Sequence, residues 1–399
     1  MAEDVNQLLH QARISRQQGD IGAALKVLQR AEKLSPGNTQ VLLALGSELD
    51  AQHEPQKAVS VLQKAVALAP KNPEIVNALG NAEQGARRFE RALKCYQQAA
   101  KLIPDVAAVH INVGDMVRLL GDASEAKSHF SLALNLDPDN LTAHYHLAVC
   151  ELELGDAARS LQHLAAIESA TPYLPEGIGL KAAALRLAGR VDEATALLNY
   201  EQFLRIQKLP IPEGYPNIRK FNRELEKYIL SERLTRDPYS ASTRGGRHGD
   251  DLLSSPRGPA VALSQVLRAA FGAYVQGLPQ GLSHPFLSAS GQRIRLVAQA
   301  NILDSSGYLE DHVHPQAWIS AAYYVRLPAE VSSDDDSKRS GWLRFGALPS
   351  HMQIQSTDIR YVTPEEGRLV IFPSFFYHGT IPFKSPKHRV SLGIDAVCR

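Results

Sequence analysis

The sequence predicts a multidomain α + β protein in which an N-terminal α-helical solenoid precedes a C-terminal jelly roll, or double-stranded β-helix, with supporting helices. Prolines recur at a fixed interval through the first half of the chain, and short apolar segments separated by Gly, Pro, Ser and Asp follow from residue 293 onward. A proline-rich break at 209–216 separates the two patterns. We therefore expect a solenoid at 1–204, a linker at 205–260 and a jelly-roll domain at 261–399.

Composition excludes several classes of partner. The 399 residues carry a formal net charge of +1, and 21% of them are charged. So small a net charge gives no general field that would attract nucleic acid or an anionic membrane. The first residues lack a basic and apolar leader, and no segment approaches the roughly 20 apolar residues of a membrane span. The 3 cysteines have no paired spacing and are expected as reduced thiols. We expect a cytoplasmic protein that binds neither nucleic acid nor membrane.

The first half of the chain is an internal repeat with a period of 34 residues. Three sets of residues keep this phase: Pro36, Pro70, Pro104, Pro138 and Pro172; Ala12, Gly46, Gly80, Gly114, Ala148 and Ala182; and Ala24, Ala58, Ala92, Ala126 and Ala194. Two antiparallel helices would meet at the small residues of each unit, and the proline would end the second helix. The pattern is similar to that of tetratricopeptide repeats (TPR) over five or six units.

Glycines are expected in the turns between the paired helices, where a left-handed backbone ends the first helix; they are Gly19, Gly121, Gly155 and Gly189. The pattern weakens in the fifth copy, where Ser160 and Ile167 replace small residues, and is lost near Tyr200. Stacked units of this kind form a curved solenoid with a concave surface. We expect this surface to bind a protein or peptide, and a rigid spacer or dimerisation arm is the alternative.

The segment between the two parts is predicted as a connection. Residues 218–233 can form one amphipathic helix, and residues 240–258 are rich in Gly, Ser and Arg. We interpret the second stretch as a mobile lid or linker, since it lacks the residue order of a phosphate-binding loop. Residues 263–275 are expected to form a helix that backs the following sheet.

Strands are predicted at 294–302, 318–327, 342–345, 368–372 and 389–396. Their order fits a jelly roll, a fold that can hold a ligand at its mouth. A polar loop at 332–340 contains Asp334, Asp335 and Asp336. We expect these carboxylates to be solvated, because three successive side chains in an extended loop cannot converge on one metal ion.

Three histidines carry the candidate chemistry. In a strand, His312 and His314 point to the same side, and His378 follows another apolar strand. Three such donors can hold Fe(II) and leave positions open for a co-substrate and oxygen. Arg389 lies in an apolar strand, where a guanidinium would bind a carboxylate through two parallel hydrogen bonds. Sheet histidines beside a turn and a surface arginine are the alternatives.

Residues from about 290 to 399 resemble the Fe(II)- and 2-oxoglutarate-dependent dioxygenases of the prolyl-hydroxylase type. The H-x-D…H metal motif of that family falls on His312, His314 and His378, with histidine in place of aspartate, as in a bacterial H-x-H-P branch. Its R-x-S element falls on Arg389 and Ser391. Tyr324 takes a position that often hydrogen-bonds the same 2-oxoglutarate carboxylate.

The resemblance implies an enzyme, a hydroxylase that uses Fe(II) and 2-oxoglutarate and acts on a protein or peptide bound by the solenoid. It implies His312, His314 and His378 as metal ligands and Arg389, Ser391 and Tyr324 as cofactor-binding residues, with no catalytic residue beyond the ligands. Collagen-type prolyl hydroxylases likewise join TPR repeats to an oxygenase domain. On this interpretation a chain beginning near Pro210 would retain the oxygenase domain.

Two other classes of function stay open. One is a TPR scaffold that carries a catalytically inactive, metal-binding jelly roll, and His314 in place of aspartate is the feature that favours it. The other is a metal-dependent isomerase, or a dioxygenase without keto acid, which would have no use for Arg389.

Overall fold

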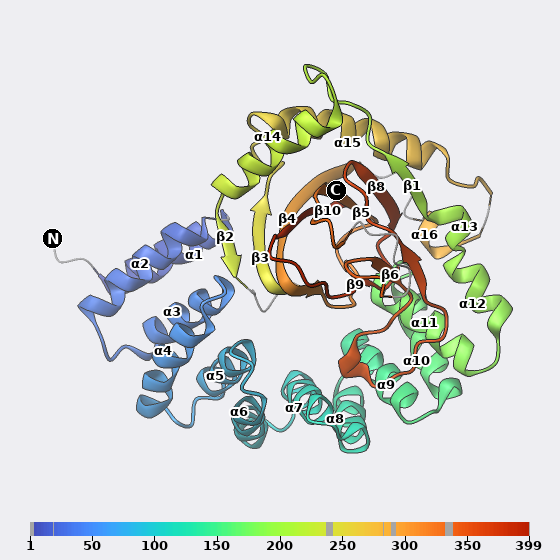
Figure 1. The fold of residues 1–399 in the computed structure, drawn as a ribbon. Helices are drawn as coiled ribbons and strands as arrows, with labels where there is room; N and C mark the ends of the chain where they lie inside the picture. Colours follow the sequence, from blue (N-terminus) through green and yellow to red (C-terminus); the bar gives the residue numbers. More distant parts are fainter. Residues whose placement is uncertain are drawn as a thin grey trace. The chain divides into compact units, whose positions relative to one another are not determined.

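A computed structural model describes residues 4–18, 20–236, 242–281, 283–288, 293–331 and 338–398. The chain forms two compact units, Met1–Leu154 and Gly155–Arg399. Figure 1 shows a run of helix pairs in the first unit and, in the second, antiparallel strands bordered by helices. The predicted combination of a helical solenoid with a jelly-roll arrangement of strands is confirmed.

The described residues of the first unit form four helix pairs at the predicted interval, followed by one further helix. Its helices are α1 (Val5–Gln17), α2 (Ile21–Leu34), α3 (Thr39–Ala51), α4 (Pro55–Leu68), α5 (Pro73–Gly85), α6 (Phe89–Leu102), α7 (Ala107–Leu119), α8 (Ala123–Leu136) and α9 (Leu141–Glu153). The phased small residues lie where paired helices touch. A Cβ at Gly46 would lie 2.4 Å from the Leu62 side chain, and one at Gly80 would lie 2.5 Å from the Tyr96 ring. A larger residue at either position would therefore push the paired helices apart.

The turn glycines also behave as predicted. Gly121, Gly155 and Gly189 have φ values of 103°, 82° and 75°, in the left-handed region that favours glycine. Gly19 lies outside the described residues.

The second unit begins with four helices, α10 (Ala157–Ala170), α11 (Pro175–Leu187), α12 (Val191–Leu198) and α13 (Tyr200–Phe203). The repeat pattern continues into them, but they share a core with the strands. Ile178 of α11, Leu198 of α12 and Phe203 of α13 belong to the same apolar cluster as Ile371 of β8 and Phe375, which follows that strand. The last helices of the solenoid pattern are therefore part of the strand-rich unit.

Two antiparallel sheets make up the rest of the unit. The large sheet has the order β1-β8-β5-β10-β4-β3-β2 and the small one β7-β6-β9. Their strands are β1 (Arg205–Lys208), β2 (Leu234–Arg236), β3 (Thr243–Asp251), β4 (Ile294–Leu309), β5 (Ile319–Arg326), β6 (Leu343–Phe345), β7 (Arg360–Val362), β8 (Arg368–Pro373), β9 (His378–Thr380) and β10 (Arg389–Cys398). Figure 1 shows α14 (Ile218–Ser231) and α15 (Pro259–Gln276) along the outside of the large sheet.

The segment predicted as a linker at 205–260 contains the expected helix, α14, but its described residues also form strands of the large sheet, so the linker interpretation is corrected. β1 pairs with β8 at one end of the large sheet, and β3 pairs with β4 near the other. The glycines that suggested a loop allow this pairing. Gly245 has a φ of 63°, and a Cβ at Gly246 would lie 2.4 Å from the Ile302 carbonyl oxygen. The Gly/Ser/Arg-rich composition therefore marks a close approach of two strands.

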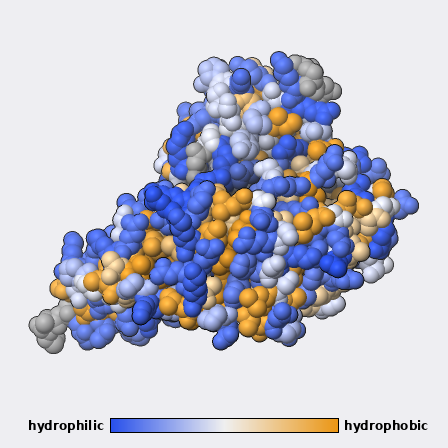
Figure 2. Space-filling view, turned by 90° about the horizontal axis from the view of Figure 1, so that it is seen from below, coloured by the Kyte–Doolittle hydropathy of each residue, from blue (hydrophilic) through white to orange (hydrophobic). Residues whose placement is uncertain are grey.

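Two further expectations concern the surface. Asp334, Asp335 and Asp336 lie outside the described residues. Of the helices in the described part of the chain, none is both long and apolar enough to cross a membrane. Figure 2 shows hydrophobic residues interspersed with hydrophilic ones over one face.

Candidate metal centre

The backbone brings the first and third candidate ligands together. His312 and His378 form an isolated antiparallel bridge, with N–H···O distances of 3.0 Å and 2.9 Å in the two directions. His314 is placed two residues beyond His312, and its backbone N–H donates to the Ser374 carbonyl oxygen at 3.2 Å. The two ligand-bearing segments are therefore joined by three backbone hydrogen bonds.

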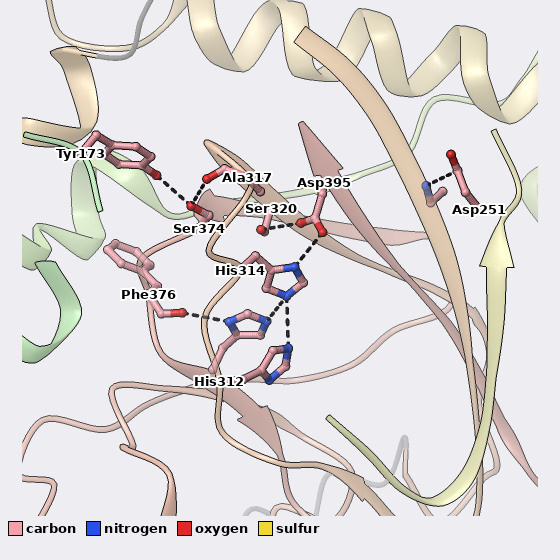
Figure 3. A network of polar contacts seen from close by, with 11 residues as sticks. Tyr173, Asp251, His312, His314, Ala317, Ser320, Ser374, Phe376 and Asp395 are labelled. Carbon is pink, nitrogen blue, oxygen red and sulfur yellow. Dashed lines mark hydrogen bonds and ion pairs between the residues drawn. The ribbon is translucent and has the colours of Figure 1, made fainter. Parts of the chain in front are cut away.

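Each imidazole is oriented by an acceptor at its Nδ1 atom. Nδ1 of His312 lies 2.7 Å from the Glu310 carbonyl oxygen, and Nδ1 of His378 lies 2.8 Å from that of Phe376. Nδ1 of His314 lies 2.7 Å from Oδ2 of Asp395 (Figure 3). Because these contacts place the ring protons on Nδ1, the Nε2 lone pairs are free to bind a metal.

The three Nε2 atoms converge on one point. Nε2 of His314 lies 3.1 Å from that of His312 and 3.2 Å from that of His378, and the three ligand atoms lie within 4.8 Å of one another. Donors about 2.0–2.2 Å from a first-row metal ion and at right angles to each other are roughly 3.0 Å apart. The spacing fits three neighbouring ligands of one ion.

Burial keeps two of the imidazoles neutral. It lowers the pKa of His312 to about 3 and that of His378 well below its usual value, with neighbouring histidines adding to both shifts. Burial also lowers the pKa of His314, but the charge and hydrogen bond of Asp395 outweigh it, so the net shift is upward. Neutral imidazoles are the form that binds a metal.

Asp395 is a functional candidate that the sequence analysis missed. Its Oδ1 accepts a hydrogen bond from the Ser320 hydroxyl at 2.7 Å, and its Oδ2 contacts His314. Burial raises the pKa of Asp395, but His314 and Ser320 lower it further, so the group is held as a carboxylate. Alternation along β10 places Asp395 on the same face as Arg389 and Ser391, and this signal could have identified it.

We expect Asp395→Asn to weaken divalent metal binding by about 10- to 100-fold, because a neutral amide orients and polarises His314 less well than a carboxylate. Competition with a coloured chelator measures the change. Asp304→Asn is the matched control. Asp304 also forms an ion pair, but its partner, Arg236, is exposed. Equal metal affinity of the Asp395 variant and the wild type would contradict the role of Asp395.

A second group of polar residues lies on the same face of β10. Arg389 is 1% exposed, its Nη1 donates to the Gly341 carbonyl oxygen at 2.8 Å, and its guanidinium lies 5.2 Å from the centre of the Tyr324 ring. Ser391 is buried and pairs with Tyr324 across β5 and β10. The structure therefore brings the three predicted cofactor-binding residues together.

Two polar atoms of this group have no protein partner. In the described part of the chain, Nε of Arg389 and the Tyr324 hydroxyl are buried without a hydrogen bond. Burial lowers the pKa of Arg389 and raises that of Tyr324, so the phenol stays protonated and can donate. A buried cation without a counter-ion is costly. The two orphaned donors therefore fit a bound anion such as a carboxylate.

The face of β10 has free space at Gly393, which lies between Arg389 and Asp395 along the strand. A Cβ built on Gly393 would meet only Nδ2 of Asn301, at 3.6 Å. The residue paired with Gly393 on β5 is Ala322, which is also small. The small side chains leave room for a molecule that reaches from the guanidinium toward the histidines.

A half-buried ion pair lies beside the residue that follows His378. Nε of Arg344 donates to Oδ1 of Asp311 at 2.9 Å, and Nη2 of Arg344 donates to Oδ2. Gly379, next to His378, lies against this pair. A Cβ there would lie 2.6 Å from Oδ1 of Asp311 and 2.8 Å from the Leu309 carbonyl oxygen.

Gly379→Ala should therefore lower the free energy of unfolding by about 1–3 kcal/mol, because neither the ion pair nor the backbone of β4 can move away freely. Gly272→Ala in α15 is the control, since a Cβ there meets no atom within 4 Å. That change should raise the free energy of unfolding by up to about 1 kcal/mol, because alanine has a higher helix propensity than glycine. Urea unfolding measures both, and a Gly379 variant as stable as the wild type would contradict the packing argument.

A helix of the repeat pattern also reaches this site. The Tyr173 hydroxyl, just before α11, lies 2.9 Å from the Trp318 carbonyl oxygen and 2.7 Å from the Ser374 hydroxyl. Ser374 in turn donates to the Ala317 carbonyl oxygen at 2.5 Å (Figure 3). A Cβ on Gly179 of α11 would lie 2.9 Å from the Phe375 carbonyl oxygen. The segment that precedes His378 is therefore packed against α11.

Comparisons with known proteins agree with this architecture. A family described as "Putative 2OG-Fe(II) oxygenase" matches residues 299–395, and tetratricopeptide-repeat families match residues 9–73, 51–111 and 118–184. No curated protein matches the chain significantly.

Solved structures match the helical part. MamA has a TM-score of 0.38 and 20% identity over 43% of this chain and 100% of its own. A tetratricopeptide repeat protein from Parabacteroides merdae has a TM-score of 0.44 and 18% identity over 56% of this chain and 87% of its own. PilW, a type IV pilus biogenesis factor, has a TM-score of 0.46 and 18% identity over 49% of this chain and 92% of its own. The chain thus carries tetratricopeptide repeats followed by a C-terminal domain that matches the 2OG-Fe(II) oxygenase family.

Proposed function

We propose that the protein is an Fe(II)- and 2-oxoglutarate-dependent dioxygenase that hydroxylates a protein or peptide bound by its repeats. The observation that carries this proposal is the proximity of two features to one strand, β10. Three Nε2 atoms converge beside its residue Asp395, and the guanidinium of its residue Arg389 is buried and has no counter-ion among the described residues. A metal site alone would need only the first feature.

The residues present fit both cofactors. His312, His314 and His378 would hold iron through Nε2, and Arg389, Tyr324 and Ser391 would hold the carboxylate of 2-oxoglutarate farthest from the metal. When bound, iron and 2-oxoglutarate together supply the oxidising chemistry: O2, 2-oxoglutarate and a substrate C–H group give succinate, CO2 and the C–OH product.

The chain itself contributes position and the exclusion of water. Asp395, Glu310 and Phe376 fix the three rings, so the ligand atoms need no rearrangement. The aromatic rings of Phe345 and Phe372 pack against the ring of His378, with centroids 6.1 Å and 4.7 Å away. Apolar walls of this kind limit the access of water to the site.

The substrate class rests on the repeats. Stacked repeats of this type commonly bind polypeptides on their concave side. Within the first unit, residues of α1 and α3 line a cavity of about 360 Å³ that includes Leu9, Arg16, Leu43 and Glu48. Apolar walls with both signs of charge suit a peptide side chain better than a small anion.

The decisive experiment is an anaerobic titration of the protein with Fe(II) and 2-oxoglutarate. Joint chelation should produce a weak visible charge-transfer band, and oxygen should then release succinate. A band without succinate, in the presence of candidate peptides, would favour the second candidate function, a TPR scaffold with an inactive metal-binding domain. His314 in place of a carboxylate is the observation that keeps that candidate open. The absence of any 2-oxoglutarate-dependent band would contradict the proposed function.

A further inference from the structure

A buried carboxylate of the repeats lacks a close cation. Glu48 of α3 is 2% exposed, and its Oε1 makes no hydrogen bond in the part of the chain that the structure describes. Its Oε2 lies 3.8 Å from Nη1 of Arg16, which is beyond hydrogen-bond distance, and the Arg16 side chain is 59% exposed. So loose a contact with an exposed partner compensates little for the burial of a charge. Burial of Glu48 should therefore lower the stability of the free protein.

The repeat itself does not need a carboxylate at this place. One, two and three periods of 34 residues farther along the chain, the equivalent residues are Ala82, Met116 and Cys150, and all three are fully buried. A small or apolar side chain is thus sufficient for the packing of the repeat. Glu48 departs from this pattern, which indicates a role other than packing.

The other buried glutamates of the first unit each have a close cation. Among the described residues these are Glu83 and Glu151, both 2% exposed. Nη1 of Arg88 lies 3.3 Å from Oε2 of Glu83, and Nζ of Lys127 lies 2.9 Å from Oε1 of Glu151. Of these three glutamates, Glu48 is the one with a buried oxygen that no group of the described chain satisfies.

Glu48 also lines the cavity of about 360 Å³ in the first unit, whose apolar walls include Leu9 of α1 and Leu43 of α3. Ligand pockets of proteins range from roughly 300 to 1,000 Å³, so the cavity has the size for one long side chain. Arg13 and Arg16 line it too, but both are exposed, so they can turn toward water at little cost. The cavity thus joins apolar walls to a buried anion.

We propose that this cavity binds a lysine or arginine side chain of the polypeptide held by the repeats. The cation of that side chain takes the place of Arg16 beside Glu48, and its aliphatic stem lies along Leu9 and Leu43. Lysine and arginine share this chemistry, a cation at the end of an apolar stem. The inference rests on the proposed function in one respect, since it takes a polypeptide as the ligand of the repeats.

Selection of displayed random peptides on the immobilised full-length protein supplies the probes. The peptides that bind should share a lysine or an arginine at one position. Exchange of that residue in a synthetic peptide for norleucine or citrulline, which keep the stem without the charge, should raise the dissociation constant by about 10- to 100-fold. The change is made in the peptide, so the fold of the protein is not altered. Titration calorimetry measures each affinity.

A Glu48→Ala protein should no longer distinguish the charged peptide from the neutral one. The exchange in the peptide should change its affinity by no more than about twofold, because the cation has lost its carboxylate. Glu48→Ala should also leave the urea midpoint at or above that of the wild type, because Ala82 fills the equivalent place in the next repeat and the buried charge is gone. A residue that only stabilised the repeats would lower the midpoint when removed.

Glu151→Ala is the matched control. It removes a glutamate that is equally buried but is paired with Lys127. Glu151 lies in α9, whereas the cavity is lined by residues of α1, α2, α3 and α5. The variant should have a lower urea midpoint, because Lys127 is left without its partner. Its affinity should keep the full dependence on the basic residue of the peptide.

The outcomes separate this inference from the function on which it rests. A wild-type protein that selects no peptide would overturn the polypeptide substrate of the proposed function and this inference with it. Bound peptides without a shared basic position would overturn the inference alone. An equal effect of the peptide exchange on the wild type and on Glu48→Ala would also overturn it, as would a Glu48→Ala protein with a lower urea midpoint.

Discussion

A chain that begins at Gly155 should fold and bind a divalent metal, whereas one that begins at Pro210 should not fold. The second truncation removes α10 to α13 and β1, although it keeps every predicted site residue. It deletes Phe203, which is fully buried and whose carbonyl oxygen accepts a hydrogen bond from Tyr274 at 2.7 Å. It also removes Tyr173 and Gly179, which contact the segment before His378.

The magnitude of this effect follows from burial. Each large apolar side chain removed from a core costs about 1.5–3 kcal/mol, and a domain is stable by only about 5–15 kcal/mol. The loss of Ile178, Leu198, Tyr200 and Phe203 together is enough to abolish folding. Far-ultraviolet circular dichroism with thermal melting compares the two fragments. A cooperative transition in the fragment from Pro210 would support the sequence-based expectation that a chain beginning there retains the oxygenase domain.

Arg389→Ala should weaken 2-oxoglutarate by one to three orders of magnitude and leave metal affinity almost unchanged. Removal of the guanidinium from a buried, charge-assisted pair leaves the carboxylate without its counter-charge. This loss costs a few kcal/mol of binding free energy. Metal affinity is spared because Arg389 contacts none of the three histidines in the described structure and bonds instead to the Gly341 carbonyl oxygen.

Arg389→Lys is the informative companion. Lysine keeps the charge but not the fork that forms two parallel hydrogen bonds, so part of the affinity should remain. Titration calorimetry with 2-oxoglutarate and with metal alone separates the two effects. Unchanged 2-oxoglutarate affinity in the alanine variant would remove Arg389 from the site and favour a metal centre without keto acid.

The repeats and the ligand histidines were predictable because their signals are local. A period of 34 residues is visible in the sequence, since each helix pair packs against its neighbours in the chain. His312 and His314 share a face by strand alternation alone. The same alternation reaches from Arg389 through Ser391 to Asp395, so the orienting carboxylate had a sequence signal that was not used.

Other features depend on contacts between distant residues and have no such signal. Tyr173 and Ser374 are separated by 201 residues in the chain. β3 was predicted as a loop because glycine usually weakens a strand, but Gly246 is needed where the backbone of β4 comes close.

The backbone bridge between His312 and His378 has a consequence for how the protein acquires its metal. Two ligands tied to each other through both main-chain hydrogen bonds cannot separate without breaking the sheet around them. Metal uptake should therefore be a reaction of an already folded protein, unlike that of small zinc modules, which fold only as the ion arrives. Because the chain is already ordered when the metal binds, folding adds little to the difference in affinity between one ion and another. Supply in the cell and the intrinsic affinity order of divalent ions would decide which metal occupies the site first.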